Sequence, residues 1–162
     1  MIVVSNTTPL IGLASVGQFD LLRRFYGEII IAEAVYQEAV AAGHEAGGAK
    51  QEVASASWIQ VRAVNDRLAV DVLLDELDLG EAETIVLARG LGADWVLMDE
   101  KKGRRKLTQL NQPKIGTVGL LLKAKQLGLL SELRPLLEQL RTQGFSISDT
   151  VVAAVLQQAS EI

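Results

Sequence analysis

Short apolar runs are the feature that most restricts the fold of this chain. Two of them are Ile2-Val3-Val4, near the N-terminus, and Trp95-Val96-Leu97-Met98, past the middle. Unbroken runs of this length predict strands that are buried on both faces, and such strands belong to parallel sheets. In open α/β sheets, ligands bind outside the carboxyl ends of the strands. The residues that follow the two runs, Asn6 and Asp99, are therefore candidates for a functional site.

Strand and helix patterns alternate along most of the chain, which predicts a three-layer α/β/α sandwich with a mostly parallel central sheet. Residues 1–130 would form this α/β domain, and residues 131–162 a helical extension packed on it. The expected strands are 2–5, 28–31, 58–61, 94–98 and the surroundings of Ile115. The expected helices are 9–16, 32–42, 66–77, 81–91, 101–110, 118–127, 134–141 and 149–160. A short amphipathic turn is expected at 20–25 and a glycine-rich loop at 43–57.

Composition excludes several classes of function. The chain has no cysteine, which excludes disulfides, thiolate metal ligands and cysteine nucleophiles. Its net charge of −4 argues against a generally basic surface, so any contact with nucleic acid must be local. No apolar stretch approaches the roughly 20 residues of a membrane span, and no basic segment precedes the first apolar run. We expect a cytoplasmic protein.

Glu81 has two interpretations. Asp78-Leu79-Gly80-Glu81 matches a capping box, in which Asp78 begins a helix and Glu81 reaches back to it. A carboxylate at that position could also bind a metal ion, and one oxygen could cap while the other ligates. Helical spacing places Glu83 on a different face, which favours Glu81 as the functional residue.

Asp99 could either cap the helix expected at 101–110 or belong to a metal site. The first turns of that helix carry a cluster of basic residues. Cations near a helix N-terminus oppose the helix dipole, so a cluster there indicates a purpose other than stability. Binding of phosphate groups is one such purpose, and a solvated basic face is the alternative. The candidate nucleic-acid-binding residues are Lys101, Lys102, Arg104 and Arg105.

Two further residues are weaker candidates. Glu38 lies at the border of the apolar face of the helix expected at 32–42, where it could join the other acids or simply be solvated. His44, the one histidine of the chain, lies in the glycine-rich loop and is interpreted as a surface residue. The chain has neither a P-loop nor a GxGxxG motif, so nothing in it supports a nucleotide cofactor.

Several segments, taken in order, match a known pattern. Together they resemble the PIN-domain superfamily, and more closely a prokaryotic PIN-like branch often found in toxin–antitoxin systems; the likeness covers roughly residues 1–130. The segments are Val3-Val4-Ser5-Asn6-Thr7-Thr8-Pro9-Leu10-Ile11, Gly80-Glu81-Ala82-Glu83, Met98-Asp99-Glu100 and Gly116-Thr117-Val118-Gly119, with Gly144-Phe145-Ser146-Ile147-Ser148 in the tail.

PIN domains are Mg²⁺- or Mn²⁺-dependent ribonucleases, so the resemblance implies a metal-dependent endoribonuclease. The family's four acidic positions fall on Asn6, Glu38, Glu81 and Asp99, which would bind the metal, with the three carboxylates catalytic. A fifth acid of some members would fall near Thr117, where this chain has no carboxylate. The partners implied are an RNA substrate, a small antitoxin protein and a second copy of the chain in a homodimer.

Asn6 keeps a second interpretation open. An amide oxygen can coordinate Mg²⁺, but it brings no charge and cannot act as a base. The three carboxylates could still hold one divalent ion. The alternative is a non-catalytic PIN-like module that binds RNA or a protein. A third possibility, a receiver-like or aspartyl-phosphate domain, needs a nucleophilic aspartate after the first strand, and Asn6 stands there instead.

Overall fold

The computed structural model describes residues 1–41 and 49–162. Within them, a five-stranded sheet has the order β3-β2-β1-β4-β5, and every neighbouring pair of strands is parallel. The predicted α/β sandwich with a parallel central sheet is therefore confirmed. The strands are β1 (Val3–Ser5), β2 (Ile29–Ala32), β3 (Ile59–Arg62), β4 (Trp95–Leu97) and β5 (Lys114–Ile115).

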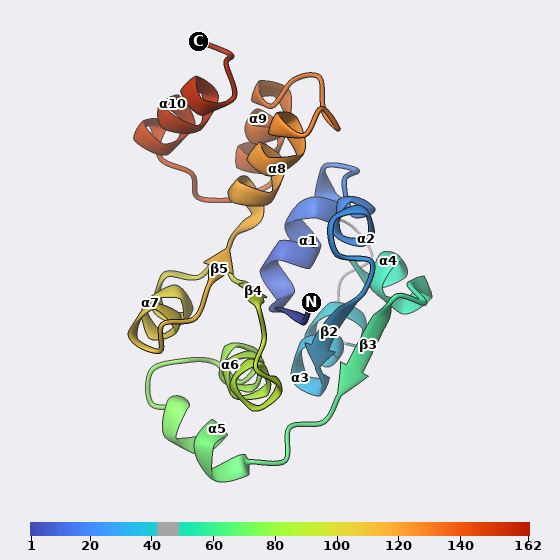
Figure 1. The fold of residues 1–162 in the computed structure, drawn as a ribbon, viewed down its shortest axis with the longest axis vertical. Helices are drawn as coiled ribbons and strands as arrows, with labels where there is room; N and C mark the ends of the chain where they lie inside the picture. The colour runs from blue at the N-terminus through green and yellow to red at the C-terminus, as the bar shows by residue number, and fades with distance from the viewer. Residues whose placement is uncertain (42–48) are drawn as a thin grey trace.

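Helices surround the sheet (Figure 1). Figure 1 shows α8, α9 and α10 grouped at one end of the molecule and α5 at the other. No helix among the described residues is long and apolar enough to cross a membrane. The helices are α1 (Thr7–Ser15), α2 (Leu21–Tyr26), α3 (Glu33–Tyr36), the π-helical η1 (Gln37–Ala41), α4 (Lys50–Ser55), α5 (Arg67–Leu73), α6 (Leu79–Leu91), α7 (Lys101–Gln109), α8 (Thr117–Gln126), α9 (Arg134–Thr142) and α10 (Asp149–Gln158).

The apolar runs form the central strands because both of their faces are covered. β1 and β2 are buried at every residue, and Val96 and Leu97 of β4 are fully buried. The edge strand β3 is more exposed: Ile59 and Gln60 are partly buried, and Val61 and Arg62 are exposed. The C-terminal segment joins the same core, to which it contributes Leu133, Leu137, Leu140 and Leu156.

Two segments differ from the elements expected of them. Residues 50–55 of the expected loop at 43–57 form α4, which buries Val53 against the core. The first part of that loop, with His44, lies outside the described residues. The expected turn at 20–25 is the short helix α2, because Leu21 and Leu22 are both buried. Burial supplied by the rest of the fold outweighed the local sequence signals at both places.

Strand register places several strand ends side by side. Ser5 of β1 pairs with Leu97 of β4, and Leu97 pairs with Ile115 of β5. The Asn6 N–H donates to the Leu97 carbonyl (2.9 Å), so the chain leaves the sheet immediately after this pairing. Residues 6, 98–99 and 116–117 therefore meet at the carboxyl edge of the sheet, as expected for Asn6 and Asp99.

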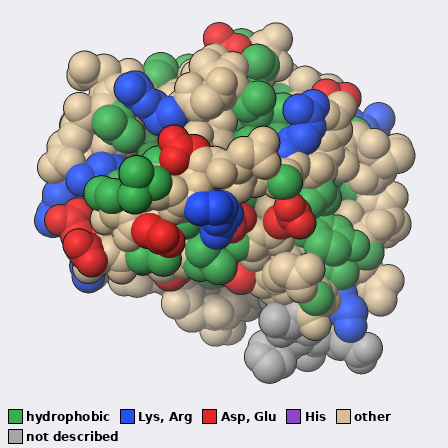
Figure 2. Space-filling model, turned by 90° about the horizontal axis from the view of Figure 1, so that it is seen from below, with side chains coloured by type: hydrophobic (Ala, Val, Ile, Leu, Met, Phe, Trp, Pro, Cys, Tyr) green, Lys and Arg blue, Asp and Glu red, His purple; other side chains and the backbone are tan. Residues whose placement is uncertain are grey.

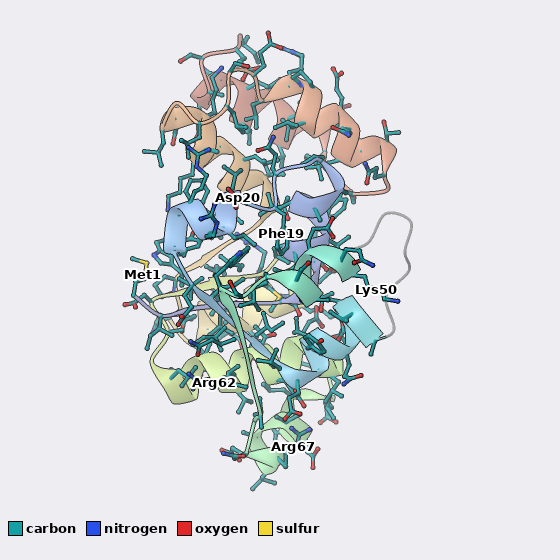
Figure 3. All side chains as sticks on the ribbon, turned by 90° about the vertical axis from the view of Figure 1, so that its right-hand side faces the viewer. Met1, Phe19, Asp20, Lys50, Arg62 and Arg67 are labelled. Carbon is teal, nitrogen blue, oxygen red and sulfur yellow. The ribbon has the colours of Figure 1, made fainter. Side chains whose placement is uncertain are left out.

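Glu83 shows how α6 is fixed to this framework. Its buried carboxylate accepts a hydrogen bond from the Ala34 N–H of α3 (3.0 Å) and pairs with Arg67 at the start of α5 (2.8 Å). Figure 3 labels Arg67 at one end of the molecule. One carboxylate thus joins three helices, while Glu81 on the same helix faces elsewhere.

Replacement of Glu83 by alanine should destabilise the fold by about 2–4 kcal/mol. It leaves the Ala34 N–H buried without a partner and removes the pair with Arg67. Urea denaturation measures the change. The matched control is Glu76→Ala, because the Glu76–Lys106 pair is long (3.6 Å) and the Glu76 side chain is 68% exposed. Its loss should be about 0–1 kcal/mol. Equal losses for the two variants would contradict this role of Glu83.

Candidate functional site at the carboxyl edge of the sheet

Asp99 follows β4 and is held by the first residue of α8. The Thr117 N–H donates to Asp99 Oδ1 (2.8 Å), and the Thr117 hydroxyl donates to Oδ2 (2.7 Å). Asp99 therefore caps α8 and not the helix that follows it in sequence; Glu100 occupies the N-cap of α7 and makes no side-chain capping bond. Burial raises the pKa of Asp99, although the two hydrogen bonds from Thr117 and the nearby Arg104 act in the opposite direction.

Glu81 forms the predicted capping box. Its N–H donates to Asp78 Oδ1 (2.8 Å), and its own Oε1 accepts a hydrogen bond from the Asp78 N–H (3.0 Å). Burial raises the pKa of Glu81, as do the nearby charges of Asp78 and Glu100, although the hydrogen bond from the Asp78 N–H lowers it. Its Oε2 takes no part in the capping box, so the dual role expected of this carboxylate stays open.

Glu38 reaches the same region from η1. The Thr7 hydroxyl donates to Glu38 Oε2 (2.9 Å), and the carboxylate lies against Gly80 at the start of α6. A Cβ atom at residue 80 would clash with Oε1, so only glycine allows this approach. Desolvation raises the pKa of Glu38, opposed by the hydrogen bond from Thr7. Glu38 belongs to the π-helical turn η1, a feature often found at functional sites.

Asn6 occupies the N-cap of α1 but does not cap it. The side chain is buried, and its Nδ2 donates instead to the sulfur of Met98 (3.3 Å). Oδ1 is buried and has no hydrogen-bond partner in the described structure. Asparagine is among the best capping residues, and a buried amide oxygen without a partner is costly, so stability alone does not explain this arrangement.

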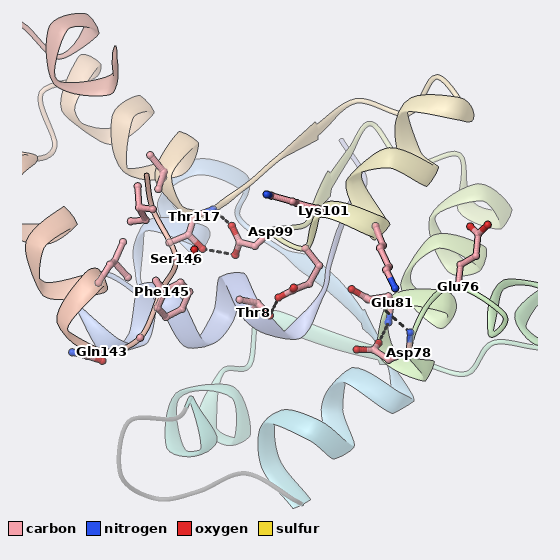
Figure 4. A pocket seen from close by; sticks show the side chains of 16 residues that line it. Thr8, Glu76, Asp78, Glu81, Asp99, Lys101, Thr117, Gln143, Phe145 and Ser146 are labelled. Carbon is pink, nitrogen blue, oxygen red and sulfur yellow. Dashed lines mark hydrogen bonds between the residues drawn. The ribbon is translucent and has the colours of Figure 1, made fainter. Parts of the chain in front are cut away.

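A cavity of about 830 Å³ opens at this edge of the sheet (Figure 4). Of the four predicted metal-binding residues, Glu81 and Asp99 line it, whereas Asn6 and Glu38 do not. Figure 4 shows Asp99 with Thr117 on one side and Glu81 with Asp78 on the other. The lining residues are Thr8, Glu76, Asp78, Glu81, Asp99, Glu100, Lys101, Lys102, Thr117, Val118, Leu140 and residues 143–147.

The expected gathering of three carboxylates is not found. Among residues 1–41 and 49–162, no three acidic or histidine side chains lie close enough to hold one ion together. The physical reason is that each acid is held by a different partner: Glu38 by Thr7, Glu81 by the Asp78 backbone and Asp99 by Thr117. The assignment of Asn6, Glu38, Glu81 and Asp99 as metal ligands stays a prediction.

The four basic residues predicted to bind nucleic acid lie in different surroundings. Lys101 and Lys102 are exposed and line the cavity, and Arg105 is exposed on the neighbouring surface beside Lys102. Arg104 is half-buried, and its guanidinium donates to the Met98 carbonyl (2.9 Å), where it fixes the end of β4 next to Asp99. We therefore interpret Arg104 as a residue that positions the site.

The surface beside α5 is mixed in charge. Figure 2 shows acidic, basic and apolar side chains interspersed over this face of the molecule, with no continuous basic area on the part that the described residues form. This agrees with the net charge of −4. At the cavity itself, the basic residues that line it are Lys101 and Lys102.

Two components of the site received no role from sequence reasoning, although the resemblance includes both segments. Thr117 follows β5, so the rule that selected Asn6 and Asp99 could have found it. The wall formed by residues 143–147 overlaps the tail segment of the resemblance, but no strand end marks it, because it comes from far along the chain: Gln143 donates to the Ser15 carbonyl across 128 residues.

A family model described as a PIN domain matches residues 2–161, nearly the whole chain. The chain belongs to the PIN-domain family. The predicted membership is confirmed, and the match also includes the tail beyond residue 130. No curated protein matches the chain. A PIN domain has a nuclease-like fold, and PIN domains generally use divalent metal ions.

The chemistry of the candidate ligands fits such an ion. All four side chains offer oxygen, which hard divalent cations prefer. The buried Asn6 Oδ1 lacks a partner in the described structure, and desolvation raises the pKa of Glu38, Glu81 and Asp99, whose ionised forms a bound cation would favour. These residues therefore suit a cation by donor type, although the described side chains do not converge on one point.

Substitution of Asp99 by asparagine should stabilise the metal-free protein at neutral pH. Because the pKa of Asp99 is raised in the folded chain, the folded state holds this proton more tightly, and the free energy of unfolding falls as pH rises above about 4. Asparagine keeps an acceptor for Thr117 and carries no charge. The melting temperature should rise by roughly 2–4 °C for each kcal/mol of relieved desolvation.

Thermal melts between pH 4 and 8 in EDTA measure this effect. The advantage of Asp99→Asn should shrink towards pH 4, where wild-type Asp99 becomes protonated. Asp71→Asn is the matched control, because Asp71 is exposed on α5. If Asp99→Asn lowered the melting temperature at pH 8 as much as at pH 4, burial would not be the dominant influence on this carboxylate.

Proposed function

We propose that this PIN domain is a metal-dependent endoribonuclease that cleaves single-stranded RNA. The observation that carries the proposal is the cavity at the carboxyl edge of the sheet, which places Glu81 and Asp99 opposite one another with Lys101 and Lys102 beside them. Carboxylates could hold a divalent ion there, and the lysines could neutralise the phosphates of a bound strand.

In this proposal Asn6, Glu38, Glu81 and Asp99 hold Mg²⁺ or Mn²⁺. When bound, the ion supplies Lewis-acid stabilisation of the phosphodiester and activation of the attacking water. Thr117 orients Asp99 through its N–H and hydroxyl, and Arg104 fixes the backbone at Met98. The catalytic acids are Glu38, Glu81 and Asp99.

A second candidate function is a non-catalytic module that binds RNA or a protein. The absence of three converging acids among the described residues favours it, as does the amide at position 6. Under this hypothesis, the acids serve mainly as caps of α6 and α8. The two candidates differ in whether divalent ions bind and whether RNA is cut.

We also propose that the protein is the toxin-like component of a toxin–antitoxin system, with a small antitoxin protein as its partner, and that it forms a homodimer. The support is the resemblance to the toxin-associated PIN-like branch. A neighbouring gene for a small DNA-binding protein, and co-purification of its product with this chain, would support the pairing; sedimentation analysis tests the dimer.

Wild-type protein should cleave mixed single-stranded RNA with Mg²⁺ or Mn²⁺ and lose this activity in EDTA. Millimolar Mn²⁺ should also raise the melting temperature of a metal-free sample, because an ion that binds only the folded state stabilises it. Asp99→Asn should abolish cleavage and the thermal shift, since it removes a negative charge from the site. Asn6→Asp should strengthen both by adding one.

Asp71→Asn on the exposed face of α5 serves as the control and should behave as wild type. Cleavage that survives Asp99→Asn would indicate a contaminating nuclease. If wild type and Asn6→Asp were both inert and neither showed a shift with Mn²⁺, the endoribonuclease proposal would fail and the non-catalytic function would stand.

Reversal of charge at Lys101 and Lys102, both to glutamate, should weaken RNA binding roughly tenfold or more at low salt. The salt dependence should also fall, by about 0.7 in the slope of log K against log salt for each phosphate that is no longer neutralised. The matched control reverses Arg24 and Arg89, two exposed residues near the ends of α2 and α6, at the opposite edge of the sheet. Equal binding by both double variants would favour protein recognition as the role of this surface.

A further inference from the structure

The wall of the cavity formed by residues 143–147 differs in chemistry from the rest of it. The sheet edge supplies carboxylates and lysines, whereas this segment supplies Gln143, Phe145, Ser146 and Ile147, none of them charged. Figure 4 shows Phe145 and Ser146 on the side of the cavity where Thr117 holds Asp99. The cavity therefore has a charged half and an aromatic, hydrogen-bonding half.

This segment is fixed in place by several hydrogen bonds. The Arg141 guanidinium donates to the Ile147 carbonyl (Nε at 2.9 Å) and to Asp149 (2.9 Å). The Phe145 N–H donates to the Leu140 carbonyl (3.0 Å), and Gln143 Nε2 donates to the Ser15 carbonyl (2.9 Å). A wall held from both sides loses little conformational entropy when a ligand binds it.

Gly12 of α1 shows how close Phe145 lies to the acidic half. A Cβ atom at residue 12 would be 2.9 Å from the Thr117 side chain and 3.1 Å from the Phe145 ring. Both side chains thus contact the same point of α1, and the Thr117 hydroxyl also binds Asp99 (2.7 Å). Thr117 therefore links the region of the Phe145 ring to Asp99, the carboxylate that the proposed function needs.

We propose that Phe145 is the stacking platform for an unpaired base of single-stranded RNA whose phosphate lies at the Asp99 and Lys101 side of the cavity. The inference rests on the proposed function and adds a base subsite to it. Aromatic rings beside basic residues are the usual means of holding single strands, because every base offers a face for stacking. Phe145 would thereby select unpaired RNA over duplex.

Hydrophobic packing alone is the competing explanation. Phe145 is partly buried and packs against the core, as many surface aromatic residues do. Leucine can replace it in that role but has no aromatic face. Phe145→Leu therefore separates stacking from packing. Phe25→Leu is the matched control, because Phe25 is also partly buried but lies on α2 with its ring beneath Lys123 and does not line the cavity.

The experiment measures binding of a short single-stranded RNA of mixed sequence, in EDTA to prevent cleavage. Each nucleotide in turn is replaced by an abasic one or by 2-aminopurine, whose fluorescence is quenched by stacking. For wild type, one abasic position should weaken binding by about 5- to 150-fold, and 2-aminopurine at that position should be quenched. Phe145→Leu should weaken binding to intact RNA by a similar factor and lose the abasic penalty and the quenching.

The outcomes separate this inference from the proposed function. If wild type binds RNA but no abasic position matters, or if Phe145→Leu keeps the same penalty and quenching, Phe145 is not the platform and the nuclease proposal is unaffected. If Phe25→Leu shows the same loss as Phe145→Leu, the effect is general and the inference fails. If wild type binds no RNA in EDTA or with Mn²⁺, the proposed function fails first. The abasic series on wild type tests the inference even if Phe145→Leu does not fold.

Discussion

The hydrogen-bonded contact between Asp99 and Thr117 is the interaction on which the candidate site depends. It ties the end of β4 to the start of α8, and both residues line the cavity. Burial raises the pKa of Asp99, whereas the two hydrogen bonds from Thr117 lower it, so the contact offsets part of the desolvation of the ionised carboxylate. A neutral side chain at residue 99 would cap α8 without the desolvation of a charge. Residues that oppose stability in this way are commonly kept for function.

A similar arrangement occurs at α6, where two acids lie near the N-terminus of the helix. Glu81 closes the capping box, and Glu38 approaches over Gly80. The positive end of the helix dipole favours negative charge at this position. An ion bound between Glu81 and Asp99 would have to compete with these hydrogen bonds or share oxygens with them. Asn6 Oδ1 has no such competitor, since no protein group binds it in the described structure.

Sequence reasoning succeeded where the signal was local. The apolar runs placed Asn6 and Asp99 at strand ends, and the spacing of Asp78 and Glu81 predicted the capping box. It failed where partners are distant in sequence. Asp99 binds Thr117, 18 residues away, where the sequence offered a metal site or capping of the next helix, and Arg104, expected to bind nucleic acid, donates to the Met98 carbonyl. No local pattern could have revealed the pairing of Asp99 with Thr117, because it depends on how β4 and β5 pair.

The sequence predicts a helical extension at residues 131–162 that packs on the α/β domain, but it does not name the contacts. In the structure Leu133, Leu137 and Leu140 belong to the common core, and the Glu161 carboxylate binds the Leu133 N–H and Lys125 of α8. Removing the tail would therefore expose core residues and also delete the uncharged wall of the cavity. Because stability and the shape of the site depend on the same contacts, the chain must be considered as one unit when its chemistry is interpreted.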